Sequence, residues 1–131
     1  MRKKQASQLF YSYFEEWIDL YKVGSVRSVT LDKYLMSLRW VRRLAPTLKL
    51  ADLNKRSYQE MLNGYAMHHE KQTTLDFHHQ VKSAILDALD EGVISTNPTR
   101  KVVIKGKVPV KTRNKFLNEY DVKKINSSIA T

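Results

Sequence analysis

The chain has 131 residues, enough for one domain or for one domain with an extension, and its 42% apolar content supports a single modest core. It contains no cysteine, which excludes a disulfide framework and a thiolate metal site and fits a reducing cytoplasm. No apolar run approaches the roughly 18 residues that a membrane span needs. The net charge of +10 makes nucleic acid the leading acidic partner, ahead of an anionic membrane surface.

The first half of the chain predicts two helices from apolar residues at 3.6-residue spacing. The first follows Ser7 and runs to about Lys22. The second starts near Ser28 or Thr30, either of which can cap the free amides of a first turn, and it stops at Pro46.

Two further helices are predicted in the second half. One begins after Asn54, and the other begins at Thr73 or Thr74 and ends at Gly92. Pro98 then prevents the helix from continuing along the chain. The predicted fold is therefore all-α, a compact four-helix bundle. The stripes predict these core residues: Phe10, Phe14, Trp17, Ile18, Tyr21, Leu31, Tyr34, Leu35, Leu38, Val41, Tyr58, Met61, Leu62, Tyr65, Phe77, Val81, Ala84, Ile85 and Ala88.

Residues 100–115 hold most of the charge imbalance. They contain seven basic side chains and no acid, whereas residues 1–99 have a net charge of only +3. Alternating apolar residues predict a strand or an extended segment here, and Asn118 is a candidate cap of a fifth helix. Seven cations without a counter-acid favour a segment that lies along a polyanion, although a solvated linker is the simpler alternative.

One ordered set of motifs resembles a known family. Residues 73–88 open with Thr-Thr and read Leu-Asp-Phe-His-His-Gln-Val-Lys-Ser-Ala-Ile-Leu-Asp-Ala, and residues 92–98 read Gly-Val-Ile-Ser-Thr-Asn-Pro. This resembles the last helix of the core-binding (SAM-like) domain of phage and integrative-element integrases, which are tyrosine recombinases. The resemblance covers about residues 8–125, with further matches at residues 14–17, 28–30 with Tyr34, 50–53 and 116–122.

The resemblance implies a division of the chain and a function. Residues 1–99 would be a core-type DNA-binding domain, residues 100–116 a basic interdomain linker, and residues 117–131 the start of a catalytic domain. The domain would grip double-stranded DNA at the core recombination site, in the cytoplasm of a bacterial host. It would be a monomer in isolation, and the full-length protein would assemble on DNA.

The family's catalytic residues do not carry over to this chain. The family uses a His-x-x-Arg pair, and none of the four histidines here has arginine three residues later. We therefore expect no enzymatic activity and no cofactor from this sequence, although its full-length parent would be a recombinase.

Polar side chains on two helices and the basic segment are expected to contact DNA. The second and fourth helices offer polar outer faces and helix starts, and the basic segment offers cations for phosphates. For each helix, the alternative is an ordinary solvated face. The candidates are Arg27, Ser28, Thr30, Lys33, Ser37, Thr73, Thr74, His79, Gln80, Lys82, Ser83, Lys101, Lys105, Lys107, Lys111 and Arg113.

The histidines form two pairs, His68–His69 and His78–His79, at the facing ends of consecutive helices. Such an arrangement could gather imidazoles around a metal ion. However, neighbours on a helix diverge by about 100 degrees, so at most one of each pair faces inward. We expect His69 and His78 to belong to the core or its boundary, with no metal site.

Two other functions fit parts of the pattern. One is a helix-turn-helix-like DNA-binding regulator, which requires a short recognition helix after a tight turn. The other is a helical protein-interaction module whose basic tail binds an acidic partner.

Overall fold

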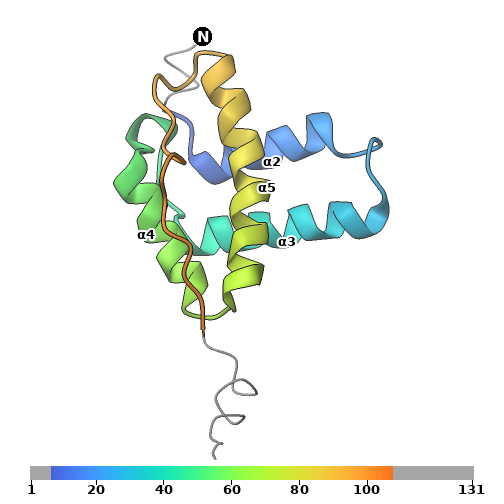
Figure 1. Ribbon diagram of the computed structural model, residues 1–131. Coiled ribbons are helices and arrows are strands. Elements are labelled where there is room, and N and C mark those ends of the chain that lie inside the picture. The colour runs from blue at the N-terminus through green and yellow to red at the C-terminus, as the bar shows by residue number, and fades with distance from the viewer. Residues whose placement is uncertain (1–6, 108–131) are drawn as a thin grey trace, which may run out of the picture.

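The computed structural model describes residues 7–107, which form four α-helices and one short 3-10 helix, with no strand among them (Figure 1). The elements are α2 (Phe10–Tyr21), α3 (Ser28–Leu44), η1 (Leu50–Asp52), α4 (Lys55–Ala66) and α5 (Lys71–Asp90). The all-α, four-helix bundle predicted from the sequence is confirmed. The predicted fifth helix after Asn118 lies outside the described residues.

The helices α2 and α3 run side by side in opposite directions, and α5 packs against α2, α3 and α4 (Figure 1). The turn between α2 and α3 contains Gly24 at φ +85°, a conformation that other residues rarely adopt. The predicted core stripes of α4 and α5 are buried throughout, as are four of the five predicted residues of α2. The sequence therefore located the inner face of three helices.

The inner face of α3 differs from the prediction. Leu35 is 38% exposed, whereas Ser37 and Val41 are buried. Leu31, Tyr34 and Leu38 are only half-buried at the edge of the core. The helix is thus rotated so that a serine, and not Leu35, faces the bundle.

A polar contact fixes α2 against α5. The indole N–H of Trp17 donates a hydrogen bond of 2.6 Å to a carboxylate oxygen of Asp87. Phe14 stacks on Trp17 with ring centroids 6.0 Å apart, so the donor belongs to a row of packed rings along α2. Asp87 therefore has a structural role, because it joins α5 to α2.

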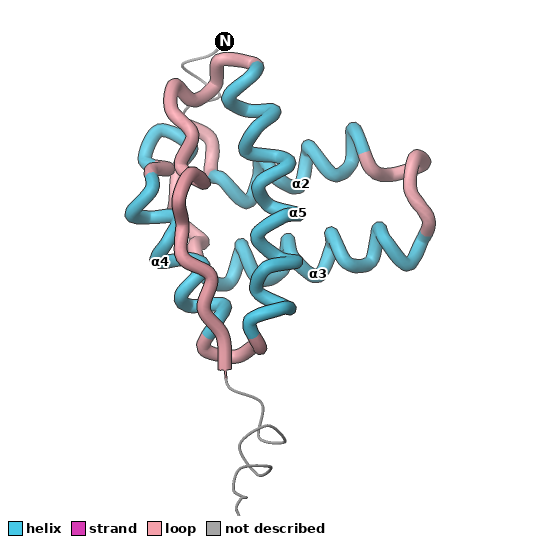
Figure 2. Tube along the Cα trace, viewed as in Figure 1, coloured by secondary structure: helices cyan, strands magenta, loops and turns pink. Residues whose placement is uncertain are grey.

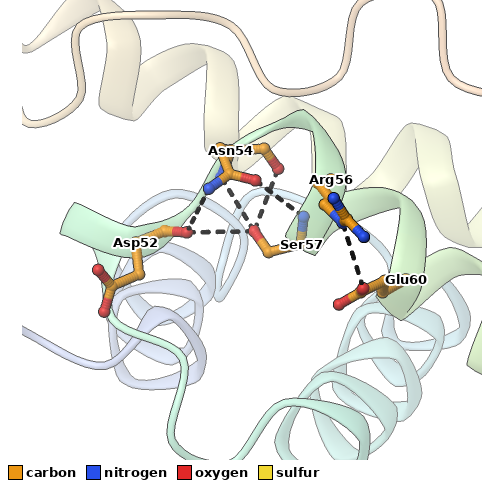
Figure 3. Close-up of polar contacts among 5 residues, drawn as sticks. All are labelled: Asp52, Asn54, Arg56, Ser57 and Glu60. Atoms are coloured by element: carbon orange, nitrogen blue, oxygen red, sulfur yellow. Dashed lines mark hydrogen bonds and ion pairs between the residues drawn. The ribbon is translucent and has the colours of Figure 1, made fainter.

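The start of α4 carries a reciprocal cap (Figure 3). The side chain of Asn54 accepts a hydrogen bond of 2.9 Å from the Ser57 amide, and the Ser57 hydroxyl accepts one of 2.9 Å from the Asn54 amide. Two otherwise unpaired backbone donors are satisfied in this way. The predicted start of this helix after Asn54 is confirmed.

The helix α3 starts at Ser28, as predicted, but its predicted cap and the predicted start of α5 are wrong. Arg27 occupies the cap position of α3, and neither Ser28 nor Thr30 makes a capping hydrogen bond. The helix α5 begins at Lys71 after Glu70, before either predicted threonine. Thr74 is fully buried and donates a hydrogen bond of 3.1 Å to the Glu70 carbonyl, so it stabilises the first turn from inside.

The segment after α5 has a defined geometry that explains its sequence. Gly92 has φ +79°, and the following amide of Val93 donates 2.9 Å back to the Ala88 carbonyl, which closes the helix. Farther on, the side chain of Asn97 accepts a hydrogen bond of 2.9 Å from the Thr99 amide. The motif from glycine to proline thus ends α5 and turns the chain back along the bundle.

Candidate nucleic-acid interface

An open groove of about 560 Å³ lies between α3 and α5. It is lined by Thr30, Lys33, Tyr34, Met36, Ser37, Tyr65, Thr73, Asp76, Phe77, His79 and Gln80. Six of these residues were predicted from the sequence to contact DNA, namely Thr30, Lys33, Ser37, Thr73, His79 and Gln80. The structure therefore brings together candidates that lie about 40 residues apart in the chain.

Exposed groups of the groove differ in their chemistry. Lys33, Thr73 and His79 are exposed, and they offer a cation, a hydroxyl and an imidazole. Asp76 adds an exposed carboxylate, and Met36 adds an apolar thioether that is 50% exposed. Met36 was not predicted, although its position one turn after Lys33 was a signal that it would share the same face.

The position of Ser37 corrects one prediction. We expected Ser37 on the outer face of α3, but it is 4% exposed and its hydroxyl donates a hydrogen bond to the Gln80 side-chain oxygen. A serine at this position is buried because its hydroxyl has a partner on α5. Ser37 and Gln80 thus join the two helices at the floor of the groove.

Five candidates on the helices do not line the groove. Arg27 and Ser28 are exposed at the start of α3. Lys82 and Ser83 are half-buried on α5, and the Ser83 hydroxyl donates 3.1 Å to the His79 carbonyl within the same helix. Thr74, which is buried, cannot present its hydroxyl to a ligand.

Acidic side chains neutralise few of the cations. Within residues 7–107 the structure has one ion pair, between exposed Arg56 and Glu60 at 3.9 Å (Figure 3). Near the other end of α3, Arg42 and Arg43 lie over the rings of Tyr11 and Trp40, at 5.4 and 5.0 Å. Lys33 in the groove has no such partner in this part of the chain.

Residues 100–107, which we call the strap, leave a turn at Arg100 and Lys101, where Lys101 has φ +56°, and then run along the bundle without helix or strand (Figure 2). Val102 and Ile104 of the strap pack against the core. The strap runs back along α4 and reaches the start of α5, where the Lys107 amide donates 2.8 Å to the His69 carbonyl. Lys101, Lys105 and Lys107 are exposed on it. Two other predicted contacts, Lys111 and Arg113, lie outside the described residues.

The inner histidines belong to the bundle. Nδ1 of His78 lies 2.7 Å from the Tyr58 hydroxyl, and burial, helped by neighbouring His79 and Lys82, lowers the pKa of His78 to about 4. The ring of His69 stacks on Tyr65 with centroids 3.8 Å apart. Both inward positions predicted for these histidines are confirmed. No group of three potential metal-binding side chains is present within residues 7–107.

Solved structures place this geometry in a family. The N-terminal domain of the prophage pi2 protein 01 integrase from Lactococcus lactis superimposes with a TM-score of 0.72 at 30% sequence identity. The match covers 76% of this chain and 94% of that domain. The chain belongs to the phage integrase family. It corresponds to the N-terminal domain of these tyrosine recombinases, as the sequence motifs indicated.

A second integrase shows the same relationship. A phage integrase fragment from Staphylococcus saprophyticus matches the integrase chain with a TM-score of 0.63 and 28% identity, over 70% of this chain and 84% of the fragment. Lambda integrase, solved as a tetramer bound to a Holliday junction, shares the fold with a TM-score of 0.67 at 21% identity. That match covers 79% of this chain and 31% of lambda integrase.

Two other comparisons found no relative: no protein-family model and no curated protein matches the integrase chain. Within its described residues, no helix combines the length and the apolar character that crossing a bilayer requires.

Proposed function

We propose that this integrase domain binds duplex DNA at the core recombination site, with the α3/α5 groove and the strap as its contact surface. The observation that carries the proposal is the convergence of Lys33 from α3 with Thr73 and His79 from α5 on one open groove. Lambda integrase, which has the same fold, was solved on a DNA junction, which supports a nucleic acid as the ligand.

The groups in the groove suit different parts of DNA. Lys33 can neutralise a phosphate, while Thr73 and His79 can hydrogen-bond either a phosphate or a base edge. The carboxylate of Asp76 repels phosphates but can accept a hydrogen bond from the amino group of cytosine in the major groove. This combination of a carboxylate, a hydroxyl and an imidazole favours a groove that faces base edges, while Lys33 contacts the neighbouring DNA phosphate backbone.

The strap supplies the sequence-independent part of binding in this proposal. Its exposed Lys101, Lys105 and Lys107 contact phosphates, and Lys111 and Arg113 continue the contact farther along the chain. The chain thereby contributes binding, and the chemical steps belong to the catalytic domain of the full-length protein. The division at residues 99 and 116, the monomeric state in isolation, assembly of the parent on DNA and the bacterial host cytoplasm are parts of the same proposal.

Salt dependence of binding to a labelled duplex, measured by fluorescence anisotropy, tests the proposal. If about six phosphates are contacted, the logarithm of the affinity should fall with the logarithm of salt concentration at a slope of about −5. Lys33→Gln should weaken binding and reduce that slope by about 0.9. Lys49→Gln, which removes an exposed lysine outside the groove and the strap, should change neither quantity.

Three results would contradict the proposal. Binding that is absent or independent of salt would exclude a phosphate-contacting surface. A palindromic footprint would favour the helix-turn-helix regulator. Anionic vesicles that compete with DNA at equal charge would favour an interaction module with a basic tail.

A further inference from the structure

Gln59 holds the strap through both polar groups of one backbone residue. Its side-chain nitrogen donates 2.9 Å to the Val103 carbonyl, and its side-chain oxygen accepts 2.8 Å from the Val103 amide. The same nitrogen also donates 2.9 Å to the Asn63 side chain, which fixes the orientation of the amide. The side chain of Gln59 therefore pairs with the strap as a neighbouring strand would.

The end of the strap lies flat on the start of α5. A Cβ atom added to Gly106 would be 2.1 Å from the Lys71 nitrogen and 2.5 Å from the Glu70 carbonyl carbon, closer than any side chain can approach. Beside it, the Lys107 amide donates to the His69 carbonyl at 2.8 Å. Glycine is required here because the two backbones are in direct contact.

The hydrogen bonds between Gln59 and Val103 fix which side chains of the strap face the core and which face solvent. Val102 and Ile104 turn inward and pack on the core, while Lys101, Lys105 and Lys107 are exposed. On an extended chain, Lys105 and Lys107 share one face and are roughly 6.6 Å apart. The contact of Gly106 with Lys71 sets this face beside the first turn of α5, which also carries Thr73 of the groove.

We propose that Gln59 is a positioning residue for DNA binding, which holds the strap on the bundle so that Lys105 and Lys107 extend the charged edge of the groove before DNA arrives. This inference rests on the proposed function. A strap that is already ordered loses less conformational entropy on binding than a free segment does. Releasing it should weaken binding without removing any phosphate contact.

Two substitutions release the strap at different points. Gln59→Ala removes both hydrogen bonds to Val103, and Gly106→Ala introduces a Cβ that the Lys71 backbone excludes. We expect each to weaken binding about fivefold, because the binding-competent arrangement becomes a minor population. The salt slope should stay that of the unsubstituted chain, whereas Lys105→Gln should reduce it by about 0.9.

Amide hydrogen exchange on the free protein provides a readout that does not involve DNA. The amides of Val103 and Lys107 should be protected in the unsubstituted chain and should exchange fast in Gln59→Ala, while amides within α5 keep their protection. The control is Gln8→Ala, which removes a glutamine hydrogen bond to Ser12 and leaves the strap contacts intact.

The outcomes separate this inference from the proposed function. If the unsubstituted chain fails to bind DNA, the proposed function fails, although the exchange experiment still reports whether Gln59 docks the strap. If that chain binds and Gln59→Ala binds equally well, Gln59 has no positioning role. Tighter binding by Gln59→Ala would show that the docked strap is inhibitory, which also overturns the inference. If Gln59→Ala does not fold, Gly106→Ala also releases the strap, and its substitution lies in the strap and not in a helix.

Discussion

His78 should make the stability of this domain depend on pH. The residue is 6% exposed on α5, and its Nδ1 lies 2.7 Å from the Tyr58 hydroxyl of α4. Burial, followed by the positive charge of nearby His79 and Lys82, lowers its pKa from 6.5 to about 4. The folded protein therefore keeps His78 neutral at pH values where the unfolded chain takes up a proton.

The sign and the size of the effect follow from these two pKa values. Between pH 6.5 and pH 4 the unfolded state binds more protons, so the stability present above pH 6.5 is lost as the pH falls. At ~1.4 kcal/mol per pH unit, His78 accounts for a loss of about 2 kcal/mol between pH 8 and pH 5. The loss reaches about 3 kcal/mol below pH 4.

Urea unfolding at pH 8, 6 and 5 measures this contribution. His78→Asn removes the titrating ring and retains an acceptor for the Tyr58 hydroxyl, so its stability should fall by about 2 kcal/mol less than that of the unsubstituted chain between pH 8 and pH 5. His68→Asn, at an exposed histidine, is the matched control for the loss of an imidazole. Parallel pH curves for His78→Asn and the unsubstituted chain would refute the assignment.

Three other substitutions test contacts that hold the bundle, each measured by urea unfolding at pH 8. Asn54→Ala removes the cap of α4 and should cost about 1 kcal/mol, whereas Arg56→Ala, in an exposed ion pair, should leave stability unchanged; equal effects would contradict the cap. Trp17→Phe leaves the Asp87 carboxylate without its indole donor and should cost about 2 kcal/mol, so an unchanged midpoint would exclude that bond. Ser37→Ala leaves the side-chain oxygen of Gln80 without its hydroxyl donor and should cost about 1–3 kcal/mol. A variant that is more stable than the unsubstituted chain would show that this hydrogen bond does not stabilise the fold.

The sequence predicted the fold because three of the helices have clean apolar stripes. Tyr58, Met61, Leu62 and Tyr65 repeat at helical spacing and are all buried, as burial of an amphipathic helix requires. In α3, Ser37 lies on the inward line that runs from Tyr34 to Val41. We predicted an exposed Ser37 because serine is polar, but its position on this line and its hydrogen-bond partner on α5 place it in the interior.

The predicted start of α5 was wrong for a related reason. Thr73 and Thr74 have the side chains of typical caps, but α5 extends past them to Lys71, beside the backbone of Gly106. Tertiary contacts of this kind override local capping preferences. They involve partners distant in sequence, so no local pattern shows them.

The groove was partly predictable, and the docking of the strap was not. The resemblance to integrases selected residues of the second and fourth helices, and six of the selected residues line one groove. In contrast, Gln59 is 44 residues from Val103 and has no motif around it. A glutamine that pairs with a distant backbone has no signature in a single sequence.

The return path of the strap determines where the chain leaves the bundle. A helix of 20 residues such as α5 is about 30 Å long, and the strap brings the chain back to the end where α5 starts. A protein shortened to residue 99 would keep every helix, but it would uncover the apolar surface beneath Val102 and Ile104 and should self-associate. When this domain is expressed alone, its sequence should therefore extend at least through Lys107. A protein fused after that residue would lie at the end of the bundle where α5 starts, close to the groove.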